Sequence, residues 1–129
     1  MRAARLGGLL LRVDGALRFS PATVALRVVG PPRVTAVPGA PPALLGVALH
    51  EGLVVPVVAI GSARGDMIVC QHAGELVGLV GGEVVRTGSF ARSGEAPDRI
   101  EHEGQSVEPL DVGAIYAQVQ SRARPVRWG

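Results

Sequence analysis

The chain has 129 residues, enough for one domain that buries a hydrophobic core without a structural metal or disulfide. Its net charge is +2, yet five of its 13 Arg lie in the first five and last eight residues, and residues 6–121 carry eight Arg against eleven acidic residues. The body of the chain therefore lacks the basic stripe of a nucleic-acid-binding protein, and no apolar run approaches the ~20 residues of a membrane span. Cys70 is the only Cys, which excludes an internal disulfide framework and fits the reducing cytoplasm.

The composition favours short β-strands. Hydrophobic residues make up 47% of the chain, but aromatic residues only 3%. Val and Leu fill the core instead, and Val is stiff at its branched Cβ and packs well on a pleated surface. The 18 Gly and 10 Pro supply turns between the strands.

The first third of the chain predicts a hairpin and one further strand. Residues 9–13 form the first strand, Asp14-Gly15 is a turn signal, and residues 16–19 return as its partner. Ser20-Pro21 predicts a single helical turn. Residues 24–29 follow as the next strand.

The second third contains a proline-rich loop and two apolar strands. Five Pro between Pro31 and Pro42 predict an ordered, packed loop with polyproline character, with a proline-rich peptide ligand as the alternative. Residues 43–50 form a strand, and Gly52 turns the chain into residues 53–60, which are apolar on both faces as in a central strand. Pro56 must lie at a bulge or face an edge, because it cannot donate to a ladder.

The last third predicts a meander, a hairpin and a helix. Residues 67–72, 75–80 and 83–86 are expected as strands, and residues 87–98 as a mobile, polar loop. Residues 99–110 form a last hairpin around Gly104. Asp111 is a candidate N-cap for an amphipathic helix with an apolar stripe at i, i+3, i+4 and i+7, namely Val112, Ile115, Tyr116 and Val119.

Four segments, in order, resemble CheW-like domains. Residues 34–47 (VTAVPGAPPALLGV) and 52–58 (GLVVPVV) are similar to the family's proline-bearing loop, its Gly-Val dipeptide and its Val-Pro-Val-Val-Asp-Leu strand. Residues 78–84 (GLVGGEV) look like its Gly-Leu-Leu-Val-Asp-Glu-Val segment. Residues 104–112 (GQSVEPLDV) look like its closing hairpin and the Leu-Asp-Leu entry to its helix. The resemblance extends over residues 9–120.

The resemblance implies a fold and an activity. The fold is mainly β: two small SH3-like five-stranded barrels packed together, with a short C-terminal helix. The chain would then be a single domain over residues 1–129, with barrels meeting near residues 61–66 and tails at 1–5 and 122–129. The implied activity is that of a cytoplasmic, non-enzymatic adaptor of bacterial chemotaxis, which couples a chemoreceptor cytoplasmic tip to the regulatory domain of a CheA-like histidine kinase. No cofactor, nucleic acid or membrane insertion is implied.

Two positions exchange charge relative to the family pattern. The family's Asn-Leu-Arg-Gly turn is Leu49-His50-Glu51-Gly52 here, so its Arg has become Glu51. A family Glu on the strand expected at residues 24–29 has become Arg27. In the family the two side chains are thought to meet. We therefore expect an Arg27–Glu51 ion pair of reversed polarity that holds the turn to the strand; two independent surface charges are the alternative. Two further family acids are replaced, by Ala59 and Gly82.

The expected partner-binding residues lie on the strand, the loop and the turn. They are Arg27, Val34, Val37, Leu49, His50, Glu51 and Gly52.

Other kinds of site find little support in the sequence. Cys70 and His72 share one strand face and would need His102 or Glu103 for a metal site, but the spacing matches no zinc pattern, so we expect no metal. No Ser lies in Gly-x-Ser-x-Gly, and no Lys is present to hold a phosphate, so no catalytic residue is assigned.

Two other functions stay open. One is a small-molecule or second-messenger site in the groove between the barrels, with an anion held by Arg86, Arg92 and Arg99. The other is weak homo-oligomerisation through an exposed barrel edge.

Overall fold

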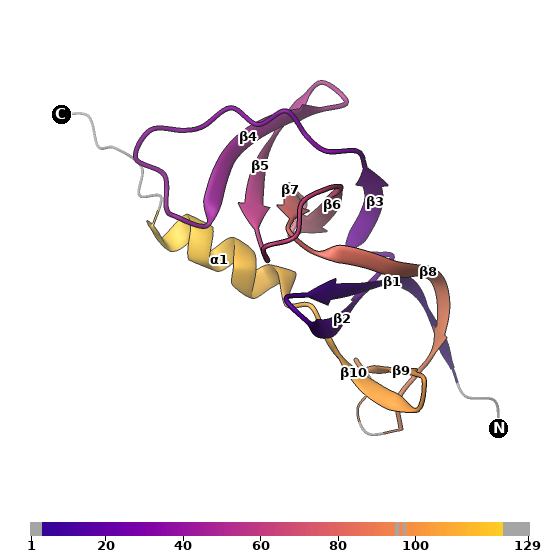
Figure 1. Cartoon of the computed structure of the whole chain (residues 1–129). Helices are drawn as coiled ribbons and strands as arrows, with labels where there is room; N and C mark the ends of the chain where they lie inside the picture. Colours follow the sequence, from indigo (N-terminus) through magenta and orange to yellow (C-terminus); the bar gives the residue numbers. More distant parts are fainter. Residues whose placement is uncertain (1–3, 95, 97, 123–129) are drawn as a thin grey trace.

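The computed structural model describes residues 4–94, 96 and 98–122, and the expected C-terminal tail therefore lies almost wholly outside the described residues. Within these described residues, ten strands and one helix follow one another (Figure 1). They are β1 (Arg5–Val13), β2 (Ala16–Pro21), β3 (Ala25–Val29), β4 (Leu44–His50), β5 (Leu53–Ala59), β6 (Met67–His72), β7 (Glu75–Val80), β8 (Glu83–Ala91), β9 (Ile100–His102), β10 (Gln105–Pro109) and α1 (Val112–Arg122).

The strands form two five-stranded sheets. The terminal sheet has the order β8-β1-β2-β10-β9 and combines strands from both ends of the chain. The middle sheet has the order β3-β6-β7-β5-β4. Most neighbours are antiparallel, but β10 pairs with β2 and β5 pairs with β7 in parallel. Pro56 lies just before the part of β5 that pairs with β7, so its missing N–H is not needed there.

Each sheet curls around its own small core, and the two sheets share a third. In β1, Leu10 points into the terminal sheet's core with Phe19 and Phe90, whose rings meet edge to face at 5.4 Å. Its neighbours Leu9 and Leu11 point to the opposite face, where the shared core contains residues of both sheets and of α1. This alternation explains the continuous apolar runs of the sequence, because such strands are buried on both faces.

Helix α1 closes the shared core. The Asp111 carboxylate caps the helix, since its Oδ1 accepts a hydrogen bond from Ala114 N–H at 2.9 Å. Val112 and Val119 are buried in the shared core, as the predicted stripe requires. Among the described residues, no helix has the length and apolar character needed to cross a bilayer.

The predicted fold class is confirmed, with three errors in individual elements. The first strand begins at Arg5 rather than Leu9, so the expected N-terminal tail already contains strand. Strand β8 continues to Ala91, through the first part of the expected 87–98 loop. It does so because β1, from Arg5 to Arg12, pairs with β8 along the whole length of β8, and because Phe90 is part of the core. The expected helical turn at Ser20-Pro21 is likewise the end of β2.

The expected junction at residues 61–66 has a different position in the topology. The segment connects β5 to β6 within the middle sheet, and the chain passes between sheets after β2 and after β7. It nevertheless touches the other sheet: Ser62 donates to Asp14 Oδ1 from Oγ at 2.7 Å and from N–H at 2.9 Å. These two hydrogen bonds hold the pKa of Asp14 below its usual value.

Candidate functional site

The tip of the β4–β5 hairpin presents apolar side chains to solvent. Glu51 and Gly52 form its two-residue turn with positive φ angles of 49° and 79°, as the turn of a tight hairpin requires. In the second residue pair from the turn, Leu49 lies opposite Val54 across the two strands. Their side chains are 74% and 66% exposed, respectively. Contacts among the described residues therefore do not account for this apolar pair.

Arg27 and Glu51 form an ion pair, so the structure brings together the two residues whose signs are exchanged. The pair connects β3, at one edge of the middle sheet, with the hairpin tip that ends β4 at the other edge. The two side chains are 56% and 61% exposed, so the pair is at the surface rather than partly buried. Glu51 Oε2 also lies 4.0 Å from His50 Nε2, whose side chain is largely buried rather than exposed at the turn tip.

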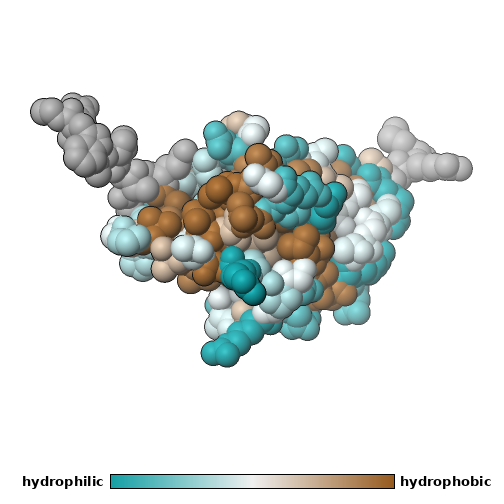
Figure 2. Space-filling view, turned by 90° about the horizontal axis from the view of Figure 1, so that it is seen from above, coloured by the Kyte–Doolittle hydropathy of each residue, from teal (hydrophilic) through white to brown (hydrophobic). Residues whose placement is uncertain are grey.

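Further apolar side chains lie exposed on β3, the hairpin and the preceding loop. Leu26 is 46% exposed because it sits at the bulge where β3 changes register against β6. Leu53 of the hairpin and Val37 of the proline-rich loop are also exposed. Figure 2 looks down on the side that carries the hairpin and this loop, and apolar surface gathers in the middle of that face. We call Leu26, Arg27, Leu49, Glu51, Leu53 and Val54 the hairpin face, after the hairpin that carries four of them; Leu49 and Val54 lie on one side of the hairpin, and Leu53 points to the other side.

A shallow groove of about 250 Å³ runs along the same hairpin. It is lined by Arg33, Thr35, Val47, Ala48, Leu49 and Val54. The groove exists because Thr35 of the proline-rich loop exchanges two backbone hydrogen bonds with Val47, at 2.8 and 2.9 Å. Gly46 permits this approach, since a Cβ at that position would collide with the Thr35 carbonyl. Val34, a predicted contact residue, packs partly against the middle sheet's core instead of standing free.

A second groove, of about 440 Å³, separates the two sheets. It is lined by Gly7, Gly8, Leu9, Ala22, Ala25, Leu26, Arg27, Val28, Thr87 and Gly88. Arg27 and Leu26 therefore belong to both this groove and the hairpin face. None of Arg86, Arg92 and Arg99, the predicted anion-binding residues of the groove, lines it. Arg86 instead stacks over the Phe90 ring, 4.6 Å from its centroid.

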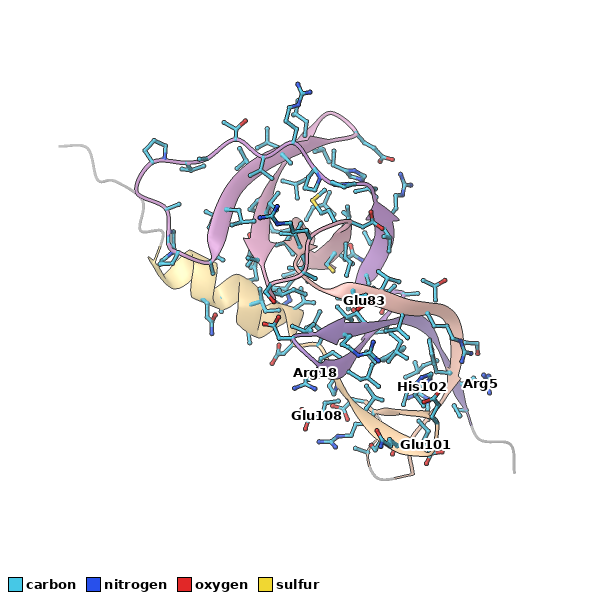
Figure 3. The ribbon with its side chains drawn as sticks, in the orientation of Figure 1. Arg5, Arg18, Glu83, Glu101, His102 and Glu108 are labelled. Atoms are coloured by element: carbon cyan, nitrogen blue, oxygen red, sulfur yellow. The ribbon has the colours of Figure 1, made fainter. Side chains whose placement is uncertain are left out.

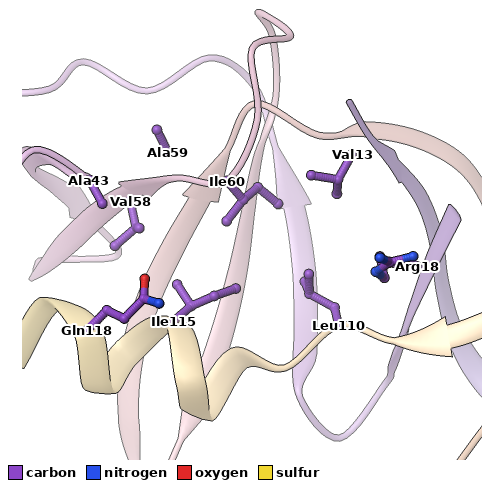
Figure 4. Close-up of a pocket in the computed structure, with 9 residues that line it drawn as sticks. All are labelled: Val13, Arg18, Ala43, Val58, Ala59, Ile60, Leu110, Ile115 and Gln118. Atoms are coloured by element: carbon purple, nitrogen blue, oxygen red, sulfur yellow. The ribbon is translucent and has the colours of Figure 1, made fainter. Parts of the chain in front are cut away.

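A third cavity, of about 260 Å³, lies between the sheets and α1 (Figure 4). Apolar side chains such as Ile60, Leu110 and Ile115 line most of it, with Arg18 and Gln118 as its polar members. It belongs to the junction of the two sheets with the helix and contains none of the predicted site residues.

The residues considered for metal or redox chemistry lie apart from these surfaces. Cys70 is fully buried in the shared core, and burial raises the pKa of its thiol to about 12. His72 is exposed and its ring faces Tyr116 of α1 at 5.8 Å. Within the described part of the chain, no three His, Cys, Asp or Glu side chains are placed to hold a metal ion.

Sequence reasoning missed three residues of the hairpin face: Leu26, Leu53 and Val54. Residues 53–60 predicted a strand buried on both faces, which is correct for Val55, Val57 and Val58. Val54 has the same side chain and differs only in its place near the free end of the hairpin. Its pairing with Leu49, whose position in the turn was visible, is the signal that points to it.

Two curled five-stranded sheets sharing one core, with a C-terminal helix, define a CheW-like fold. The comparison with solved structures agrees: the chain is similar to the scaffolding protein TtCheW from Thermoanaerobacter tengcongensis, with a TM-score of 0.60 and 15% sequence identity. The match covers 81% of this chain and 87% of that protein. No family model matches the sequence, and no curated protein matches it either. The chain therefore has a diverged CheW-like fold.

Proposed function

We propose that the chain is a non-enzymatic adaptor that couples a chemoreceptor-type sensor to a CheA-type histidine kinase in the cytoplasm, or does the same in an analogous motility complex. Two observations support the proposal. The fold is similar to that of a protein described as a scaffolding protein. The hairpin face exposes Leu49 and Val54 to solvent, as expected of side chains that a partner covers.

The hairpin face is the expected contact for the kinase regulatory domain. Binding energy at protein interfaces comes mainly from a few apolar or aromatic side chains that become fully buried. Leu49, Val54 and Leu53 are the side chains here with the most apolar area left to bury. The shallow groove beside them offers a place for a partner side chain between Arg33 and the hairpin.

The groove between the sheets is the expected contact for the sensor. Its lining is mainly apolar, and Arg27 at its border also pairs with Glu51 of the hairpin face. A partner at either surface would therefore meet a charge of this pair in a position where the usual family pattern has the opposite sign. Charge complementarity governs the choice of partner more than raw affinity does. We therefore expect a dedicated sensor or kinase whose own contact charges are exchanged to match.

Titration calorimetry with the regulatory domain of the CheA-like kinase encoded in the same genome tests the proposal. We expect Leu49→Ser and Val54→Ser each to weaken binding about tenfold or more, as loss of a central contact does. Val85→Ser is the matched control, because Val85 is an exposed apolar residue on β8 of the other sheet and should leave affinity unchanged. Circular dichroism checks that each variant is folded.

Two results would overturn the proposal. One is the absence of binding to every encoded CheA-like regulatory domain. The other is a loss of affinity in Val85→Ser as large as that in Leu49→Ser. Light scattering of the chain alone separates a third outcome, in which a second copy of the chain covers the hairpin face and the hairpin variants abolish a dimer.

A further inference from the structure

The terminal sheet carries a polar hollow of about 380 Å³ that is separate from the hairpin face and from the groove between the sheets, and shares Arg18 with the cavity beside α1. It lies at the β1–β2 turn and the β9–β10 hairpin. We call it the arginine hollow, and its lining residues are Arg12, Gly15, Leu17, Arg18, Arg99, Gln105, Ser106, Val107 and Glu108. This volume is within the range of sites for small ligands.

The hollow has an excess of positive charge. Among the described residues, three guanidinium groups line it, against the carboxylate of Glu108 alone. Glu108 stands between two of them, with Oε2 3.7 Å from Arg18 Nη2 and Oε1 3.5 Å from Arg99 Nη2. Figure 3 shows Arg18 and Glu108 side by side on the terminal sheet. The Arg12 guanidinium forms no hydrogen bond or ion pair with any described residue. The lining thus carries a formal charge of +2.

The strand ladder fixes this arrangement. Glu108 of β10 lies directly opposite Arg18 in the parallel pairing with β2. Arg99 immediately precedes β9, which pairs with β10 on its other side. The backbone therefore holds two arginines on either side of one carboxylate.

The resident ion pairs are weak enough to be displaced. Both distances exceed those of a charge-assisted hydrogen bond. Glu108 is 53% exposed and its arginine partners are 35% exposed, so solvent screens both pairs. An anion with more charge than a carboxylate competes well with Glu108, because guanidinium groups bind phosphate oxygens through two parallel hydrogen bonds.

We propose that the arginine hollow is a binding site for a phosphate dianion, either inorganic phosphate or the phosphate group of a small phosphorylated metabolite. Arg18 and Arg99 hold the dianion, Arg12 neutralises its remaining charge, and Gln105 supplies a neutral donor at the edge. Glu108 acts as the competing internal anion that the ligand displaces. The site is independent of the proposed partner surfaces, since it shares no lining residue with the hairpin face or the groove between the sheets.

Calorimetric titration of the full chain at low ionic strength tests the site. The probes are inorganic phosphate, pyrophosphate, a nucleoside monophosphate and the matching uncharged nucleoside. Saturable binding of the phosphates with one site, and none of the nucleoside, supports the proposal. Tighter binding of the monophosphate than of inorganic phosphate identifies a phosphorylated metabolite as the ligand, and equal binding identifies phosphate itself.

Variants of opposite sign make the test specific. Arg12→Gln and Arg99→Gln should each weaken phosphate binding about tenfold, whereas Glu108→Gln should strengthen it several-fold because the competing anion is gone. Arg64→Gln, at an exposed position outside the hollow, is the matched control and should change nothing. The proposal is overturned if no phosphate binds saturably at millimolar concentration, if Glu108→Gln leaves affinity unchanged, or if Arg64→Gln weakens it as much as Arg99→Gln.

Discussion

The ion pair between Arg27 and Glu51 links the two edges of the curled middle sheet, but more than half of each side chain is exposed. Exposed ion pairs stabilise a fold by only ~0.2–1 kcal/mol, because water screens them and two long side chains must be ordered. The reversed polarity therefore matters more for the charges offered to a partner than for stability.

A double-mutant cycle at these two positions separates stability from recognition. We expect Arg27→Glu and Glu51→Arg to lower the free energy of unfolding by about 1 kcal/mol or less each, since each places like charges together. The double swap restores an attractive pair and should recover most of that loss in urea denaturation. In the binding assay, however, the double swap should stay impaired toward the cognate partner.

If the double swap loses as much stability as the sum of the two single variants, the side chains do not interact in solution. If it binds the cognate partner like the wild type, the polarity of the pair has no role in recognition.

At the residue scale, the sequence predicts charge relations better than exposure. The ion pair follows from two sign exchanges at positions that face each other. The exposure of Leu26 and Val54 could not be predicted, because apolar residues are common on surfaces and composition alone does not place them. Only the strand pairing and the bulge in β3 show which apolar side chains stay exposed to solvent.

At the scale of elements, strands with close partners along the chain were predicted well. Strands β6 and β7 match their expected bounds, because a tight turn and alternating residues mark them locally. Strand β8 was predicted too short, since its second half is polar and Gly-containing. Its partner β1 lies more than 70 residues earlier in the chain, and that long-range pairing makes residues 87–91 a strand.

Phe90 distinguishes a packed strand from the mobile loop that the sequence predicted. Its ring is buried in the terminal sheet's core against Phe19. We expect Phe90→Ala to lower the free energy of unfolding by about 3–5 kcal/mol, as large-to-small core substitutions do. Thr87→Ala, at an exposed position on the same strand, should change it by less than about 0.5 kcal/mol. Equal, small effects in urea denaturation would place Phe90 in a loop.

At the scale of the whole molecule, the two sheets form one unit. The shared core contains Leu11 of the terminal sheet, Ile68 of the middle sheet and Val119 of α1. Next to it, Gly81 comes so close to Gly61 that a side chain on either would collide with the other's backbone. The sequence indicated two barrels through its resemblance to CheW-like domains. It did not show that one sheet combines strands from both ends of the chain, because that depends on pairing between distant strands.

Gly81→Ala tests this close contact. Its φ of 102° disfavours any side chain, and the added Cβ would strike the Gly61 carbonyl. We expect a loss of about 1–3 kcal/mol in the free energy of unfolding. Gly30→Ala, where a Cβ meets open space, should be nearly neutral. A Gly81→Ala variant as stable as the wild type in thermal denaturation would show that the contact between these backbones is loose.

The proposed adaptor must bind a sensor and a kinase at the same time. Size-exclusion chromatography with light scattering, on a mixture of the cognate sensor tip, the kinase regulatory domain and this chain, detects such a ternary complex. We predict one peak with the mass of the ternary complex, and this peak requires the chain. With the Leu49→Ser/Val54→Ser variant, the kinase domain should elute separately. Sensor and kinase that co-elute equally well without the chain, or that compete for it and never bind together, would contradict the account.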